Sequence, residues 1–116
     1  MPDATTLGGP GKAVTFDYTG SVREGIVIHY DYANVSVGRE LLNLALTAFR
    51  GRRVPGGFAE DHPTPNGFGE WVRGNSKHNS QPLTPRHASR IAAILVVEGY
   101  ATSDREGNAV FIRFNA

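Results

Sequence analysis

The side chains best suited to chemistry lie between residues 73 and 90, where the chain carries several cations and no acid. Lysine and arginine hold phosphate groups, and a local stripe of them can do so in a protein with little net charge. The alternative is a solvated polar loop beside an ordinary helix. The stripe is a candidate anion-binding surface, and its members are Arg73, Lys77, Arg86 and Arg90, with His78 and His87 among them.

The other reactive side chains form no catalytic or metal-binding motif. The four histidines lack metal-site spacing, and consecutive ligands such as residues 60–62 rarely converge on one ion. No serine lies in a Gly-x-Ser-x-Gly motif, and residues 8–11 lack the lysine spacing of a phosphate loop. We therefore expect a protein that is not an enzyme and uses no metal or cofactor. A metal held by His62 and a second histidine would change that expectation.

Composition is that of an ordinary folded domain. The chain has 116 residues, 40% of them hydrophobic and 20% charged, a net charge of +1 and no cysteine. The absence of cysteine excludes disulfides and thiolate metal sites. No apolar run is long enough to span a membrane, and the N-terminus lacks a signal-peptide pattern, so we expect a cytoplasmic protein. We predict a flexible tail over 1–11, rich in glycine, followed by one domain over 12–116.

The clearest predicted element is a helix over 84–98. Thr84 is a suitable N-cap, and Pro85 fits the first helical position, where its missing N–H does no harm. Gly99 can adopt the left-handed conformation that ends a helix. The spacing predicts a buried stripe formed by Ala88, Ile91, Ala92 and Leu95. It predicts an exposed face formed by Arg86, Ser89, Arg90 and Ala93.

Two hairpins flank the helical part of the chain. Apolar residues alternate over 12–18 and again over 26–32, with turn residues between them, which predicts an N-terminal hairpin. A second hairpin is predicted over 100–114, because a polar turn at 104–108 precedes another alternating run.

Two further helices are expected between the hairpins. One runs over 39–50, with Ser36 as a candidate N-cap and Gly51 at its end. Residues 52–65 read as a loop, because they are rich in glycine and proline. A short helix follows over 67–74, in which Trp71 is expected to be a core anchor rather than a base-stacking platform. Residues 75–82 are expected to be irregular.

This order of elements resembles the winged helix-turn-helix family over about residues 36–114. The resemblance rests on the helix ending in Val96-Val97-Glu98-Gly99-Tyr100 and on the strand-turn-strand that follows it. It implies an α+β fold with a three-helix core, a C-terminal β-hairpin wing and an additional N-terminal β-hairpin. The ten-residue connection from Gly74 to Leu83 is longer than the turn of a compact helix-turn-helix.

In the winged-helix family the second helix of the motif enters the major groove and the wing touches the DNA backbone. The resemblance therefore implies a double-stranded-DNA-binding protein, such as a small transcriptional regulator. We also expect a homodimer; the tyrosines and isoleucines of the hairpin over 12–32 either form its contact surface or extend the core. Helix 84–98 would lie in the groove, where Arg86 and Arg90 would read bases or clamp phosphates. The complete set of implied contacts is Arg73, Lys77, Thr84, Arg86, His87, Ser89, Arg90 and Arg105.

A second interpretation uses the same fold without nucleic acid. Winged-helix domains also serve as protein-interaction or oligomerisation modules, since fold does not dictate function. The basic stripe would then meet an acidic partner, and the hairpin over 12–32 would form a contact surface.

Overall fold

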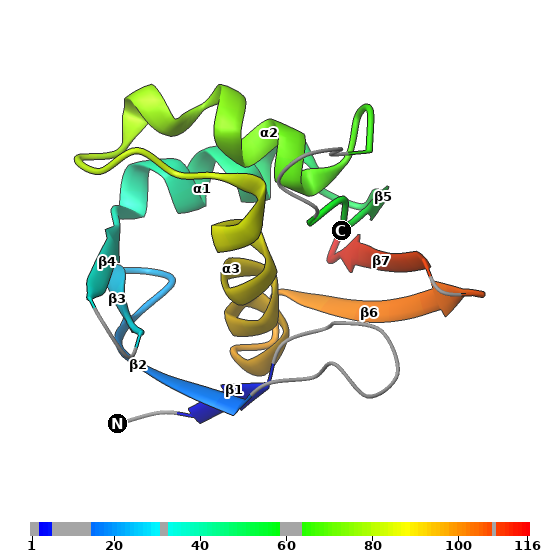
Figure 1. Ribbon diagram of the computed structural model, residues 1–116. Helices are drawn as coiled ribbons and strands as arrows, with labels where there is room; N and C mark the ends of the chain where they lie inside the picture. The colour runs from blue at the N-terminus through cyan, green and yellow to red at the C-terminus, as the bar shows by residue number, and fades with distance from the viewer. Residues whose placement is uncertain (1–2, 6–14, 31–32, 59–63, 108) are drawn as a thin grey trace.

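A computed structural model describes residues 3–5, 15–30, 33–58, 64–107 and 109–116. These residues form an α+β fold with three α-helices, one short 3-10 helix and two small antiparallel sheets. Helix α3 stands in the middle of the molecule, with α1 and α2 across one end (Figure 1). The N-terminal sheet and the C-terminal sheet lie on different sides of α3 (Figure 1).

The N-terminal sheet has four strands in the order β1-β2-β3-β4. Strands β2 (Thr15–Ser21) and β3 (Gly25–His29) form the predicted hairpin, with Tyr18 opposite Ile28. Strand β1 (Asp3–Thr5) pairs with β2, and β4 (Asn34–Val37) pairs with β3. The predicted hairpin is thus the centre of a larger sheet. Part of the predicted tail over 1–11 is the edge strand β1, and the rest of that segment lies outside the described residues.

The predicted N-cap of the first helix is wrong. Ser36 lies within β4, and helix α1 (Arg39–Ala48) begins after Gly38, which adopts extended backbone angles without a side-chain cap. One face of α1 and its C-cap is buried at Leu41, Leu42, Ala45 and Phe49, whereas Ala48 is exposed. Gly51 has a φ of 71°, the left-handed conformation expected after a helix.

The segment predicted as a loop over 52–65 contains a strand. Strand β5 (Arg53–Pro55) pairs with β7 (Ala109–Phe114), and β7 pairs with β6 (Ala101–Glu106). Three residues cannot display a clear alternation, and the partner of β5 is more than fifty residues away in sequence, so no local pattern identifies the strand. The sheet order is β5-β7-β6.

The helix predictions over 67–74 and 84–98 are confirmed. Helix α2 spans Phe68–Gly74, and helix α3 spans Pro85–Val97 with Thr84 as its N-cap. Gly99 has a φ of 85°, and the Tyr100 N–H bonds back to the carbonyl of Leu95 at 2.9 Å. Between the two helices, part of the segment expected to be irregular forms a 3-10 turn, η1 (Ser76–His78).

One hydrophobic cluster joins both sheets to the helices. Tyr18 and Ile28 contribute from the N-terminal sheet, Ile112 and Phe114 from β7, and Ile94 from the centre of α3. Helix α3 is buried on more than its predicted stripe, because Ala93 and Ile94 are covered as completely as Ile91. Among the described helices α3 is the longest at 13 residues, and none has the length and hydropathy of a membrane-spanning helix.

Candidate functional site

Helix α3 begins with a local network that uses two of the predicted site residues. Thr84 and His87 form a capping box, in which the Nδ1 atom of His87 accepts a hydrogen bond from the Thr84 N–H at 3.1 Å. This bond satisfies a backbone donor at the helix start that would otherwise lack a partner. The His87 ring also packs edge-on against Tyr30 of the N-terminal sheet, with ring centroids 5.9 Å apart. These contacts give His87 a structural role at the helix start.

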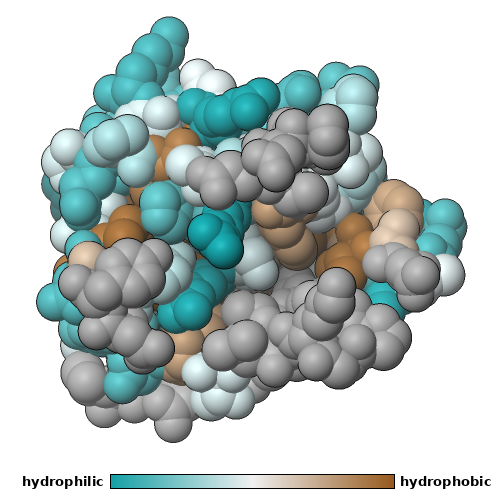
Figure 2. Space-filling model, in the orientation of Figure 1, coloured by the Kyte–Doolittle hydropathy of each residue, from teal (hydrophilic) through white to brown (hydrophobic). Residues whose placement is uncertain are grey.

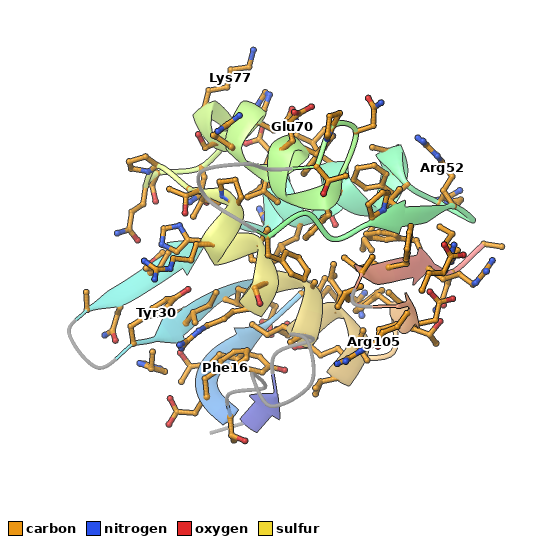
Figure 3. All side chains as sticks on the ribbon, turned by 45° about the vertical axis from the view of Figure 1, so that its right-hand side comes forward. Phe16, Tyr30, Arg52, Glu70, Lys77 and Arg105 are labelled. Atoms are coloured by element: carbon orange, nitrogen blue, oxygen red, sulfur yellow. The ribbon has the colours of Figure 1, made fainter. Side chains whose placement is uncertain are left out.

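Arg90 does not lie on an exposed face, contrary to the prediction. Its guanidinium carbon lies 4.0 Å from the centre of the Tyr30 ring and 5.0 Å from that of Phe16. Its Nη1 donates to the carbonyl of His29 at 3.4 Å. Figure 3 shows Phe16 and Tyr30 on the side of α3 that carries the N-terminal sheet. The sheet therefore covers the middle of the basic face, and Ala93, predicted to be exposed, is buried there.

The remaining cations of the stripe stay at the surface. Arg86 is exposed in the first turn of α3, and Ser89 is half-buried one turn later. Arg73 at the end of α2 and Lys77 in η1 are exposed on the segment that connects the two helices. Lys77 points away from the body of the molecule (Figure 3). The exposed part of the stripe is therefore the connection between α2 and α3 together with the start of α3.

This long connection is fastened to the N-terminal half by side chains that sequence reasoning missed. The Asn79 side chain accepts from the Gly38 N–H at 2.7 Å and donates to the Ser36 carbonyl at 2.8 Å. The Gln81 side chain accepts from the Ser36 N–H at 2.6 Å. His78 lies 3.7 Å from Glu40 of α1. Asparagine and glutamine in a polar loop carry no local signal of such partners, so only the tertiary structure identifies them.

Arg105 is exposed near the tip of the β6–β7 hairpin, as predicted. The neighbouring acids of β6 are engaged by Arg53 of β5, which lies 3.0 Å from Asp104 and 3.1 Å from Glu106. The Arg53 guanidinium also stacks 3.9 Å from the centre of the Phe111 ring. Arg53 lay in the segment predicted as a loop, so its role in joining the strands was missed. Arg53, together with Arg113 at 4.0 Å from Asp104, offsets the two negative charges beside Arg105.

The side chains described here do not assemble a metal site. Within the described ranges, no group of three or more His, Asp or Glu side chains could hold an ion. His62 lies outside the described residues. The candidate site is the exposed basic surface formed by the α2–α3 connection and the start of α3.

Comparisons with protein-family models, with curated proteins and with solved structures found no match to this chain.

Proposed function

We propose that this protein is a winged-helix DNA-binding protein, such as a small transcriptional regulator, that holds DNA chiefly through its phosphates. The observation that carries the proposal is the order of elements. Helices α2 and α3 are followed directly by the β6–β7 hairpin, and the pairing of β5 with β7 anchors that hairpin beside the helices. In this proposal α2 and α3 are the helix-turn-helix and the β6–β7 hairpin is the wing. Held side by side, the two would contact a DNA groove and the adjacent backbone together.

Surface charge supports phosphate contact more strongly than base reading. Arg73, Lys77 and Arg86 are exposed around the start of α3, and Arg105 is exposed on the hairpin. Arg90 is turned into the N-terminal sheet, so the proposed groove contacts reduce to the first turn of α3. Phosphate contacts fix position and contribute affinity but carry no sequence information. We therefore expect modest sequence preference and strong salt dependence.

The test is fluorescence anisotropy with random duplex DNA across a salt series. Affinity should fall steeply as salt rises, because each neutralised phosphate releases counterions. Arg86→Ala should reduce the magnitude of the log–log slope by about 1, the loss of one phosphate contact. The matched control is Arg23→Ala, an exposed arginine in the β2–β3 turn, which should leave the slope unchanged. Absence of binding at low salt would refute the proposal.

The N-terminal sheet packs over Arg90 on α3, and this favours a second candidate function, a protein-interaction or oligomerisation module. A half-buried groove helix is less suited to DNA, and the exposed cations would instead meet an acidic protein. Among the described residues, Leu44 and Val97 are the large hydrophobic side chains that are exposed. The described surface therefore favours a polar protein contact over an extensive apolar one. Sedimentation velocity with and without duplex DNA separates the two functions and tests the proposed homodimer.

A further inference from the structure

A groove of about 400 Å³ lies between α2 and the end of α1. One wall is formed by α2 and the two residues just before it. The residues of this wall recur every three or four positions, so they lie on one face of the helix. The other wall is the end of α1. We call this hollow the α1–α2 groove, and its lining residues are Phe49, Arg52, Asn66, Gly67, Glu70, Trp71, Gly74 and Asn75. Its volume lies within the range of small-molecule sites.

The apolar part of the groove is an aromatic wall in a fixed orientation. Trp71 is half-buried, and its ring lies nearly parallel to Phe68, at 7° with centroids 6.3 Å apart. Phe49 meets the Trp71 ring edge-on at 5.4 Å. These contacts hold the indole in place while part of it lines the groove. Trp71 therefore packs against the core, as predicted, and also gives the groove an aromatic wall.

The polar part of the groove has one cation and one anion at different positions. Arg52 is exposed, and within the described part of the chain no carboxylate forms an ion pair with it. Glu70 is half-buried, and among the described residues the one hydrogen bond it accepts is long, 3.4 Å, from the Asn66 N–H. In Figure 3, Glu70 lies at the top of α2, and Arg52 lies to its right with its guanidinium pointing outward. The Arg52 guanidinium lies 5.6 Å from the centre of the Phe49 ring, so the two charges line the groove at separate positions and do not pair with each other.

Amide groups and missing side chains complete the groove. Asn75 donates to the Trp71 carbonyl at 2.8 Å, which fixes its side chain at the rim. Asn66 has a φ of 63°, and among the described residues it is the one non-glycine residue with a positive φ. Such a conformation at a concave site is a reason to look for function. At Gly74 an added Cβ would meet nothing within 4 Å, so the groove is open at that position.

From this set of groups we propose that the α1–α2 groove binds a guanine nucleotide. The base would stack on Trp71, as bases stack on aromatic side chains in protein sites. Arg52 would hold the phosphate, for which the guanidinium fork is well shaped. Glu70 would read the base, because an ionised carboxylate only accepts hydrogen bonds and guanine presents two adjacent donors, N1–H and the N2 amino group. Adenine presents a lone acceptor at N1, which a carboxylate repels.

The test uses Trp71 as its own reporter, since it is the only tryptophan in the chain. GMP should quench its fluorescence in a saturable manner, and calorimetry should give the same affinity. AMP should bind about tenfold more weakly, the loss of one charge-assisted hydrogen bond. Guanosine, which lacks the phosphate, should also bind about tenfold more weakly. Equal binding of AMP and GMP would overturn the proposed reading of the base.

Variants separate the groove from binding elsewhere. Gly74→Leu adds a bulky side chain at a groove-lining position where an added Cβ meets nothing within 4 Å, and it should abolish binding while the circular dichroism spectrum is retained. Glu70→Gln should lose the preference for guanine over adenine, with Glu24→Gln as the matched exposed control. Arg52→Ala should bind GMP no better than guanosine, with Arg23→Ala as its control.

A complete lack of saturable GMP binding, or GMP binding unaffected by Gly74→Leu, would refute the site. Neither result bears on duplex DNA, because the proposed DNA contacts lie on other residues. The proposal therefore stands or fails separately from the proposed DNA-binding function.

Discussion

Arg90 belongs by sequence to the basic face of α3, yet its guanidinium packs against two aromatic rings of the N-terminal sheet. A cation on an aromatic ring contributes about 0.5–2 kcal/mol, depending on desolvation. The aliphatic stem of arginine adds packing that alanine would lose. Arg90 therefore acts as a connection between the sheet and α3.

We predict that Arg90→Ala lowers the free energy of unfolding by about 1–2 kcal/mol, since it removes both ring contacts and stem packing. Urea denaturation measures this loss, and the exposed Arg23→Ala variant is the control. The salt slope of DNA binding should stay close to that of the unsubstituted protein. A fully stable variant that binds DNA more weakly would instead return Arg90 to the interface.

Tyr18 joins the same sheet to the other end of α3. Its hydroxyl donates to Oε2 of Glu98 at 2.7 Å, and Oε1 of Glu98 accepts from the Val22 N–H at 2.9 Å. Hydrogen bonds to charged groups contribute about 1.5–3 kcal/mol. We expect Tyr18→Phe to lose about 2 kcal/mol of unfolding free energy in urea denaturation. Tyr100→Phe is the matched control and should change stability far less.

The same tyrosine makes stability depend on alkaline pH. Burial raises the pKa of Tyr18 above its ordinary value of 10.0, and the hydrogen bond to Glu98 and the Glu98 charge raise this pKa further. A group whose pKa is higher when folded stabilises the protein fully below the unfolded pKa and loses this contribution as pH rises. The unfolding free energy should therefore fall above about pH 10, and less steeply in Tyr18→Phe. Equal slopes in both proteins would contradict this assignment.

At the scale of elements, the attachment of the β6–β7 hairpin depends on β5, a strand of three residues. Strand β5 has few backbone bonds of its own, so the side chain of Arg53 supplements them through Asp104, Glu106 and Phe111. The two ion pairs raise the pKa of Arg53, chiefly through its hydrogen bond to Asp104. The β6–β7 hairpin is thus held to β5 by ion pairs as well as by backbone pairing.

We predict that Arg53→Ala speeds hydrogen exchange of the amides in β5 and along β6–β7 while exchange in α3 is unchanged. The reason is that local opening depends on the contacts that are lost. High salt should produce part of the same effect in the unsubstituted protein, because exposed ion pairs are screened. Arg50→Ala, an exposed arginine beyond α1, should leave the pattern intact. Unaltered exchange in β5 would show that backbone pairing alone holds the strand.

At the scale of the molecule, both sheets and all three α-helices share one core. The radius of gyration is 12.7 Å, close to the roughly 13 Å expected of a single compact domain of this length. Phe16 and Tyr18 from one sheet and Phe114 from the other belong to the same buried cluster. The N-terminal sheet is therefore part of the domain and not an appendage.

This arrangement predicts cooperative unfolding. Urea transitions followed by Trp71 fluorescence, which reports on α2, and by far-ultraviolet circular dichroism should coincide, as for a two-state domain. Separate midpoints would show that the N-terminal sheet unfolds independently. In that case the N-terminal sheet could detach from α3 and expose Arg90, which would strengthen the case for base reading by Arg90.

Features set by neighbouring residues could be predicted from the sequence. The ends of α3 follow from Thr84, Pro85 and Gly99, whose backbone preferences act within one turn. The alternation of Phe16 with Tyr18 and of Ile26 with Ile28 identified buried strand faces in the same way. The α+β class and the order of helices and hairpins could therefore be predicted from local rules.

Only the tertiary structure determined where the basic residues point and which segments pair over long distances. Arg86 and Arg90 share a helical face by spacing, but Tyr30 and Phe16 cover one of them and leave the other exposed. Strand β5 exists because β7 offers it a partner, and the α1–α2 groove exists because the end of α1 reaches Trp71. Each of these depends on contacts between residues far apart in the chain, for which periodicity and capping contain no information.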